Sequence, residues 1–206
     1  MRLVVGSVVI AMAVASTSAY AGSVSYDAAF GPASVSTGTT VSLPEFDPSI
    51  GTLTGVTLEL DANTFAGSIA WDNEADVDSE VTLGIGAEVV ATGPGALVLT
   101  AVPLQTDSST VDADNDGTAD FVGSDAFTVT GGSGNDQDID SPGTFPSYVG
   151  TSTFDVTITS SIETLLSTTG GFGPIDPTPG TYDGTVTVTY DYIPEPASAI
   201  LIGAGL

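Results

Sequence analysis

Residues 184–192 read Gly-Thr-Val-Thr-Val-Thr-Tyr-Asp-Tyr, and their strict alternation of polar and apolar side chains decides the fold class. Successive side chains of a β-strand point to opposite faces, so Val186, Val188 and Tyr190 share one face while the threonines share the other. A strand with one apolar and one polar face is typical of an antiparallel sheet that buries one side and leaves the other in water. The segment therefore predicts a half-buried strand.

The same period of two recurs earlier in the chain, in segments separated by turns rich in Gly, Pro and Asp. The apolar sets are Val24/Tyr26/Ala28/Phe30, Val56/Leu58/Leu60, Val81/Leu83/Ile85, Phe127/Val129 and Phe154/Val156/Ile158. Residues 170–180, rich in Gly and Pro, are expected to form a long loop. We predict an all-β fold, a jelly-roll-like sandwich of two antiparallel sheets, with little or no helix outside an N-terminal leader.

Composition restricts the chemistry that this chain can perform. Its 206 residues include one Lys or Arg (Arg2) against 26 Asp and Glu, with no His and no Cys, for a net charge of −25. Ser–His and Cys–His nucleophiles, Schiff bases and imidazole bases are therefore excluded. Without basic side chains nothing can neutralise phosphates, so nucleic acid is excluded as a direct partner. We expect a protein that is not an enzyme.

The N-terminus has the pattern of a secretory signal. Met1-Arg2 precedes an apolar run over residues 3–15, and Ala19-Tyr20-Ala21 supplies the small residues of a cleavage site. We predict a signal peptide over residues 1–21, with Ala19 and Ala21 defining cleavage before Gly22. A single β-sandwich domain is expected over residues 22–193. The absence of Cys means that its core must suffice without disulfides.

One acidic segment fits the start of a calcium-binding loop. Carboxylates at its first, third and fifth positions, Gly117 at the sixth and oxygen donors at the seventh and ninth are the pattern that wraps a hard cation. The twelfth position is Gly123 rather than Glu, which excludes a true EF-hand, and Asp125 or Asp107 is expected to supply a further ligand. The alternative is a solvated Asp/Gly turn without an ion. The predicted Ca²⁺ ligands are Asp112, Asp114, Asp116, Thr118 and Asp120.

Trp71 precedes a second acidic group, over residues 72–80. A tryptophan beside carboxylates can stack on a sugar, and Tyr190 with Tyr192 offers another such surface. The competing interpretation places all three rings in or at the core. We favour the core for Trp71, because no second aromatic residue is positioned to complete a platform.

The chain closes with Pro194-Glu195-Pro196-Ala197-Ser198 and the apolar residues 199–206. Proline lacks an amide donor, so Pro194 is expected to end the last strand. The motif resembles the PEP-CTERM sorting signal of Gram-negative bacteria, with Pro194, Glu195 and Pro196 as the sorting residues. The resemblance implies an exosortase as partner. Residues 194–206 are then the motif and the start of a hydrophobic segment that this chain truncates, since a spanning helix needs about 20 residues.

The body of the chain resembles the choice-of-anchor E domain that precedes such signals. The matching stretches are residues 46–53, which lead into the strand over 56–60, then 120–123, and finally 184–190. The resemblance implies an exported β domain at the cell surface or in the extracellular matrix, and it implies no catalytic residues.

These features predict a non-enzymatic structural protein, exported to the surface or matrix of a Gram-negative bacterium and stabilised by calcium. Exopolysaccharide of a biofilm or envelope components are the expected partners. One alternative is a carbohydrate-binding module. Another is a self-assembling fibre subunit in which Ser23 to Phe30 pairs with an edge strand of the next subunit.

Overall fold

The computed structural model describes residues 21–114 and 117–195, and this part of the chain is built from strands and short 3-10 turns. No α-helix occurs in these ranges, which confirms the predicted all-β class. The strands are β1 (Gly22–Ser34), β2 (Gly38–Pro44), β3 (Gly51–Phe65), β4 (Ser68–Asp72), β5 (Ser79–Thr92), β6 (Val98–Ala101), β7 (Leu104–Val111), β8 (Ala126–Thr130), β9 (Ser133–Asp140), β10 (Thr153–Thr168), β11 (Ile175–Thr178) and β12 (Thr181–Pro194). The 3-10 turns are η1 (Pro48–Ile50), η2 (Pro94–Ala96) and η3 (Pro146–Tyr148).

Two antiparallel sheets form the main sandwich, with strand orders β1-β12-β3-β9 and β2-β10-β5-β6. The pairings are nested: the first of these eight strands pairs with the last, β2 with β10, β3 with β9, and β5 with β6. A long hairpin folded in this way and rolled into two sheets is a jelly roll. The predicted jelly-roll-like sandwich is therefore confirmed.

The core of the sandwich lies between the faces that the alternating pattern predicted to be apolar. Leu58, Leu60, Val186, Val188 and Tyr190 are at most 1% exposed. The threonines between them on β12 remain on the outer face and are partly exposed. The period of two thus sets which face of each strand is buried, because burial of the apolar face drives the two sheets together.

A third sheet, β11-β4-β8, extends the molecule at one end. Each of its strands continues a strand of the first sheet along the chain, with interruptions at 66–67, 131–132 and 179–180. We expected residues 170–180 to form a single long loop. This expectation is wrong, because β11 lies within these residues and pairs with β4. Pro177 hides this strand in the sequence, although proline is tolerated on an edge strand such as β11.

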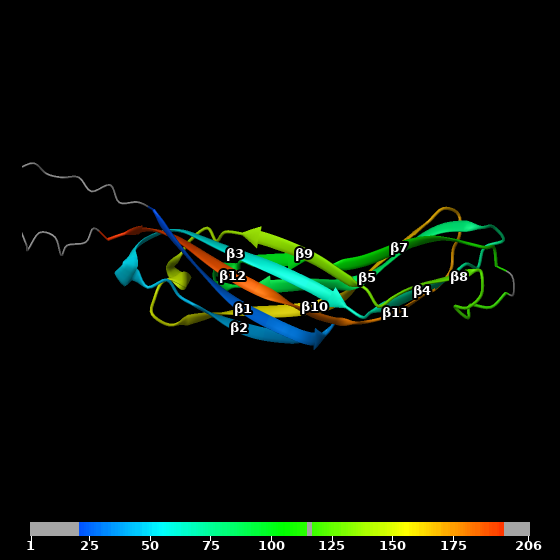
Figure 1. The fold of residues 1–206 in the computed structure, drawn as a ribbon, viewed down its shortest axis with the longest axis horizontal. Helices are drawn as coiled ribbons and strands as arrows, with labels where there is room; N and C mark the ends of the chain where they lie inside the picture. Colours follow the sequence, from blue (N-terminus) through cyan, green and yellow to red (C-terminus); the bar gives the residue numbers. More distant parts are fainter. Residues whose placement is uncertain (1–20, 115–116, 196–206) are drawn as a thin grey trace, which may run out of the picture.

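In the opposite layer, two strands continue past these interruptions without a break. β5 and β10 stay paired from Thr92 and Thr157 to Val81 and Thr168, while β6 pairs with one half of β5 and β7 with the other half. We call β4, β7, β8, β11 and the adjoining ends of β5 and β10 the distal lobe (Figure 1). Its separate core consists of Ile69, Trp71, Val81, Leu83, Ile85, Val111 and Val129.

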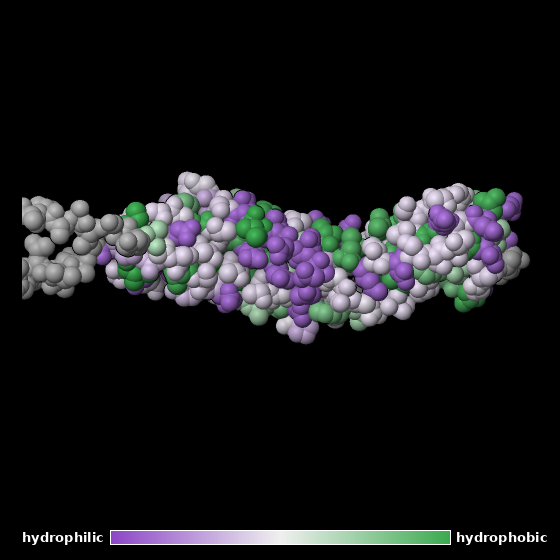
Figure 2. Space-filling model, turned by 45° about the horizontal axis from the view of Figure 1, so that its top comes forward, coloured by the Kyte–Doolittle hydropathy of each residue, from purple (hydrophilic) through white to green (hydrophobic). Residues whose placement is uncertain are grey.

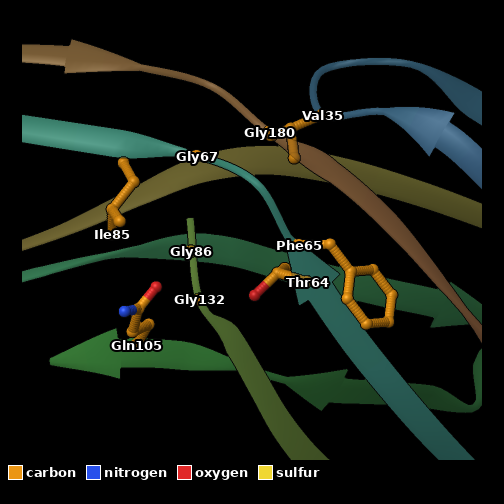
Figure 3. A pocket seen from close by; sticks show the side chains of 9 residues that line it. All are labelled: Val35, Thr64, Phe65, Gly67, Ile85, Gly86, Gln105, Gly132 and Gly180. Carbon is orange, nitrogen blue, oxygen red and sulfur yellow. The ribbon is translucent and has the colours of Figure 1, made fainter. Parts of the chain in front are cut away.

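Glycines allow neighbouring strands of the interrupted layer to approach closely where the lobe joins the sandwich. The Ala66 amide donates to the Gly132 carbonyl at 3.2 Å, the Gly131 amide donates to the Gly67 carbonyl at 3.1 Å, and a Cβ on Gly180 would overlap the Phe65 carbonyl oxygen. Figure 3 shows Phe65, Gly67, Gly132 and Gly180 around a cavity of about 10 Å³, which is large enough for about one water molecule. The strand breaks are thus bridged by direct backbone contacts.

Candidate functional site

The acidic segments singled out in the sequence meet at the far end of the distal lobe, opposite the start of β1 and the end of β12 (Figure 1). We call this region the tip and define it by residues 72–79, 112–125 and 170–174, of which 115–116 lie outside the described part. Backbone bonds hold its segments together. The Glu74 amide donates to the Phe172 carbonyl at 2.8 Å, and the Asp112 amide donates to the Ser124 carbonyl at 3.0 Å.

Asn73 organises the tip from its centre, where it is fully buried. Its side-chain nitrogen donates to the carbonyls of Val77 and Asp112, both at 2.8 Å, and its side-chain oxygen accepts from the Ala75 amide at 3.2 Å. Its own amide donates to the Asp125 carbonyl at 2.9 Å. One side chain thereby ties the β4–β5 turn to the connection between β7 and β8.

Two carboxylates of the tip are buried, although the domain contains no basic side chain. Asp72 and Asp125 are each 2% exposed. The Asp72 Oδ2 atom accepts a 2.6 Å hydrogen bond from the Phe121 amide, and nearby the Asp78 Oδ1 atom accepts one from Ala113 at 3.0 Å. A hydrogen bond to an ionised acceptor is stronger than a neutral one, so the Phe121 amide offsets part of the cost of burying Asp72.

The predicted calcium ligands lie on the 112–120 loop, except that Asp116 is outside the described residues. Gly117 has a φ of +71° at the sixth position, where a sharp turn was expected. The Asp114 Oδ1 atom accepts from the Gly117 amide at 2.8 Å, and the Asp120 Oδ1 atom accepts from Val122 at 3.0 Å. Within residues 21–114 and 117–195, no three acidic side chains converge as a metal-binding group.

Of the two candidates for a further ligand of the loop, Asp125 and Asp107, the structure brings only one to the tip. Asp125 lies immediately before β8, within the tip. Asp107 lies within β7, opposite Leu83, five residues before Asp112. Five residues of extended strand span about 16 Å, so Asp107 is too distant to complete the loop.

The aromatic side chains considered for sugar stacking belong to the core. Trp71 and Tyr190 are fully buried, which confirms the core interpretation of Trp71. The Tyr190 hydroxyl donates to the Pro44 carbonyl at 2.8 Å, and burial raises the pKa of this phenol. Tyr192 is half-buried, and its ring centroid lies 5.5 Å from that of Phe46. Neither Trp71 nor Tyr190 presents a free face to a ligand.

Two carboxylates on β9 have a structural role that was not predicted from the sequence. The Asp138 Oδ2 atom accepts from the Thr100 amide at 2.8 Å, and the Asp136 Oδ2 atom accepts from the Val102 amide at 2.7 Å. These amides belong to β6 and the residue just after it, at the edge of the opposite sheet. The Asp-x-Asp spacing on a strand was the available signal, because it places both carboxylates on one face.

The described processing residues, Ala21, Pro194 and Glu195, lie at the end of the molecule opposite the tip. β12 ends at Pro194, opposite Gly51, and Glu195 and Ala21 are exposed. Ala19 and Pro196 lie outside the described residues. In the described ranges no helix has the length and apolar character needed to span a bilayer.

Comparisons with known proteins give distant structural likenesses only. No family model and no curated protein matches the chain. A structure of infectious bursal disease virus, Gx strain, has 8% identity and a TM-score of 0.13, and the match covers 88% of this chain and 43% of that one. The T=1 particles derived from infectious bursal virus give 9% identity, a TM-score of 0.14, and coverage of 86% and 42%. This chain thus spans less than half of those chains, and such scores support no structural or functional argument.

Replacing Asn73 by Ala is expected to destabilise the protein strongly. The substitution leaves the carbonyls of Val77 and Asp112 and the Ala75 amide without their side-chain partner, at an expected loss of about 2–4 kcal/mol in the free energy of unfolding. Urea denaturation followed by circular dichroism measures this loss. Asn135→Ala is the matched control, since Asn135 is exposed on β9 and its side chain bonds at the surface. Equal losses for both variants would contradict the role given to Asn73.

Proposed function

We propose that this protein is a non-enzymatic structural domain, exported to the surface or extracellular matrix of a Gram-negative bacterium. The observation that best supports this is the polarity of the elongated fold. Gly22, the expected first residue after cleavage, pairs with Tyr192, just before the Pro-Glu-Pro motif, so both ends of the domain lie at one pole. The acidic tip lies at the other pole (Figure 1). A tether at residues 194–198 would hold one pole and present the tip outward.

The surface chemistry supports a structural rather than a catalytic role. Hydroxyl and carboxylate groups dominate the outer faces of the strands, and Figure 2 shows hydrophilic side chains in a band across the middle of one face and again toward the distal end. Of the 206 residues, only Arg2 is basic, and it lies in the predicted signal peptide. A strongly negative, hydroxyl-rich surface keeps a protein soluble and well hydrated in a polymer matrix.

Calcium is the cofactor that we propose for the tip. The 112–120 loop has the expected turn at Gly117, and the buried Asp125 lies beside it. Neighbouring carboxylates repel one another, and an external divalent ion relieves that repulsion when no basic side chain is present. Binding to the folded state alone would stabilise the domain by mass action.

Self-assembly through the free edge of β1 is a second candidate function, favoured by a difference between the two sides of the sandwich. One side is closed by hydrogen bonds that the amides of Thr100 and Val102 donate to Asp138 and Asp136. On the other side β1 is an edge strand with a single charged residue, Asp27. Because β1 already pairs with β12 of its own chain, assembly would add a strand to its free edge rather than exchange β1 between subunits.

Fractionation of the producing bacterium tests the main proposal. We expect the protein in the surface or extracellular-matrix fraction, with a mature N-terminus at Gly22 in mass spectrometry. Deleting residues 2–21 should retain it in the cytosol, while the variant Asp140→Asn should be exported as the native protein is. An intact leader on a cytosolic native protein would rule out the proposed location.

Millimolar calcium is expected to raise the melting temperature, and EDTA to lower it, at matched ionic strength. The double variant Asp112→Asn/Asp120→Asn should lose the response, because two loop carboxylates are neutralised. Asp140→Asn/Asp155→Asn changes the net charge equally at positions away from the tip and should keep the response. Calorimetric scans with and without calcium measure these shifts. A calcium response that is absent, or equal in both variants, would exclude the loop as the site.

Sedimentation velocity tests the assembly candidate. Association is expected at high protein concentration in salt or calcium, which screen the negative charge. Adding charge to the β1 edge with Ser23→Glu/Ala29→Glu should prevent it, because like charges would then face each other across the new strand pair. Ser133→Glu/Gln137→Glu on β9 adds the same charge elsewhere and should leave association unchanged. A monomer under all conditions argues against this candidate.

A further inference from the structure

The outer face of the distal lobe carries a hollow on the β5, β7 and β10 strands. It has a volume of about 490 Å³, which lies within the range of ordinary ligand sites. Three neighbouring strands form its floor, with β5 in the middle, β7 on one side and the end of β10 on the other. We call it the hydroxyl hollow, and its defining residues are Glu80, Thr82, Ser108, Thr110, Ser167 and Thr169.

Strand register arranges these side chains in two rows. Thr82 pairs with Ser108 on one side and with Ser167 on the other, which gives a row of three hydroxyls. Glu80 pairs with Thr110, and its backbone bonds to Thr169 on the other side through the Thr169 hydroxyl at 3.0 Å and the Thr169 amide at 3.1 Å. Neighbouring strands lie about 4.8 Å apart, and residues two positions apart on a strand lie about 7 Å apart.

The rows offer donors and acceptors together. The hydroxyls of Thr82 and Ser108 lie 2.8 Å apart and share one hydrogen bond. Each hydroxyl has one donor and two acceptor sites, so the pair retains one donor and three acceptor sites. The exposed carboxylate of Glu80 adds acceptors in the second row. A ligand that matches this surface carries many groups that both donate and accept, and the hydroxyls of a sugar have this property.

Charge selects the kind of glycan. The net charge is −25, and residues 3–206 contain no Lys, Arg or His. Nothing in the hollow could neutralise the uronate, sulfate or phosphate groups of an anionic polymer, and the field of the protein repels them. A cationic ligand, in contrast, would be drawn to the tip, where carboxylates are concentrated, rather than to a hollow with the single acid Glu80.

We propose that the hydroxyl hollow binds a neutral polysaccharide chain. This inference rests on the proposed function, because it names the matrix component that the exported domain would contact. The core side chains Val81 and Leu83 fix the floor from below, so the hydroxyl rows stand on a packed sheet. None of the residues that line the hollow is aromatic. Affinity for a single sugar is therefore low, and a polymer with many repeats gains through multivalency.

Affinity electrophoresis of the purified full-length protein tests the proposal. The gels contain dextran, mannan or soluble β-glucan as neutral probes, or alginate as an anionic probe, each with calcium and with EDTA. We expect at least one neutral polymer to retard the native protein in both buffers. Thr82→Val/Ser108→Ala/Thr110→Val should weaken binding about tenfold or more, since each lost hydrogen bond contributes about two- to tenfold.

The matched control is Thr185→Val/Thr187→Val/Thr189→Val on the outer face of β12, which also removes three hydroxyls and should bind as the native protein does. Valine keeps the β-branched shape of threonine, so strand preference is retained. If circular dichroism shows that the hollow variant is unfolded, Ser108→Ala and Glu80→Gln are measured in its place, and each should weaken binding at least twofold.

Three results would overturn the inference. They are the absence of retardation by every neutral probe, equal weakening in the hollow and control variants, and retardation by alginate alone in calcium. The location of the protein in the cell is a separate readout. A surface protein that binds none of the neutral probes would refute the hollow and leave the proposed function standing, whereas a cytosolic protein that binds them would do the reverse.

Discussion

Every carboxylate in the domain must be stabilised without a basic side chain, and this constraint shapes much of the structure. The only Lys or Arg is Arg2, so ion pairs cannot hold the acidic segments in place. Backbone amides take that role instead, as for Asp72 in the tip and Asp136 on β9. The same kind of bond, from the Ser49 amide, holds the pKa of Asp47 below its usual value. Carboxylates that bond to backbone amides also fix turns and cover strand edges.

The jelly-roll topology gives the molecule two different ends. Connections at one end lengthen into the distal lobe, which has its own small core and carries the tip and the hydroxyl hollow. The other end holds both ends of the domain and the short turns η1, η2 and η3. Only β5 and β10 run unbroken from one part to the other. The tip and the hydroxyl hollow, which a partner could contact, thus lie on a lobe that the packed sandwich supports.

The fold followed from the sequence wherever alternation was strict. Val186, Val188 and Tyr190 could be assigned to a buried face because a strand with that pattern has only one way to bury it. The strand β11 could not be found, because a short edge strand that contains Pro177 has the same composition as a loop. The junction between β3 and β4 was equally hidden in the sequence, because Gly67 at this junction lies against residues distant in the chain, Ile85 and Gly180.

The candidate site was predictable in place but not in detail. The spacing of Asp112, Asp114 and Asp120 located the acidic loop, and Gly117 located its turn. The bond from Asn73 to Asp112 had no local signal, because the two residues come together only through tertiary packing. The same is true of the hydroxyl hollow. Thr82 and Ser108 are ordinary strand residues until the register sets them side by side.

Gly22 and Tyr192 lie side by side, so the described domain begins and ends at nearly the same point. A polypeptide that enters at the first strand leaves at almost the same point after the last, so the whole unit can be joined to flanking sequence without threading through it. Domains whose termini are close together tolerate such insertion into other proteins. Copies joined in series would then branch from a common backbone as side arms, instead of lining up end to end.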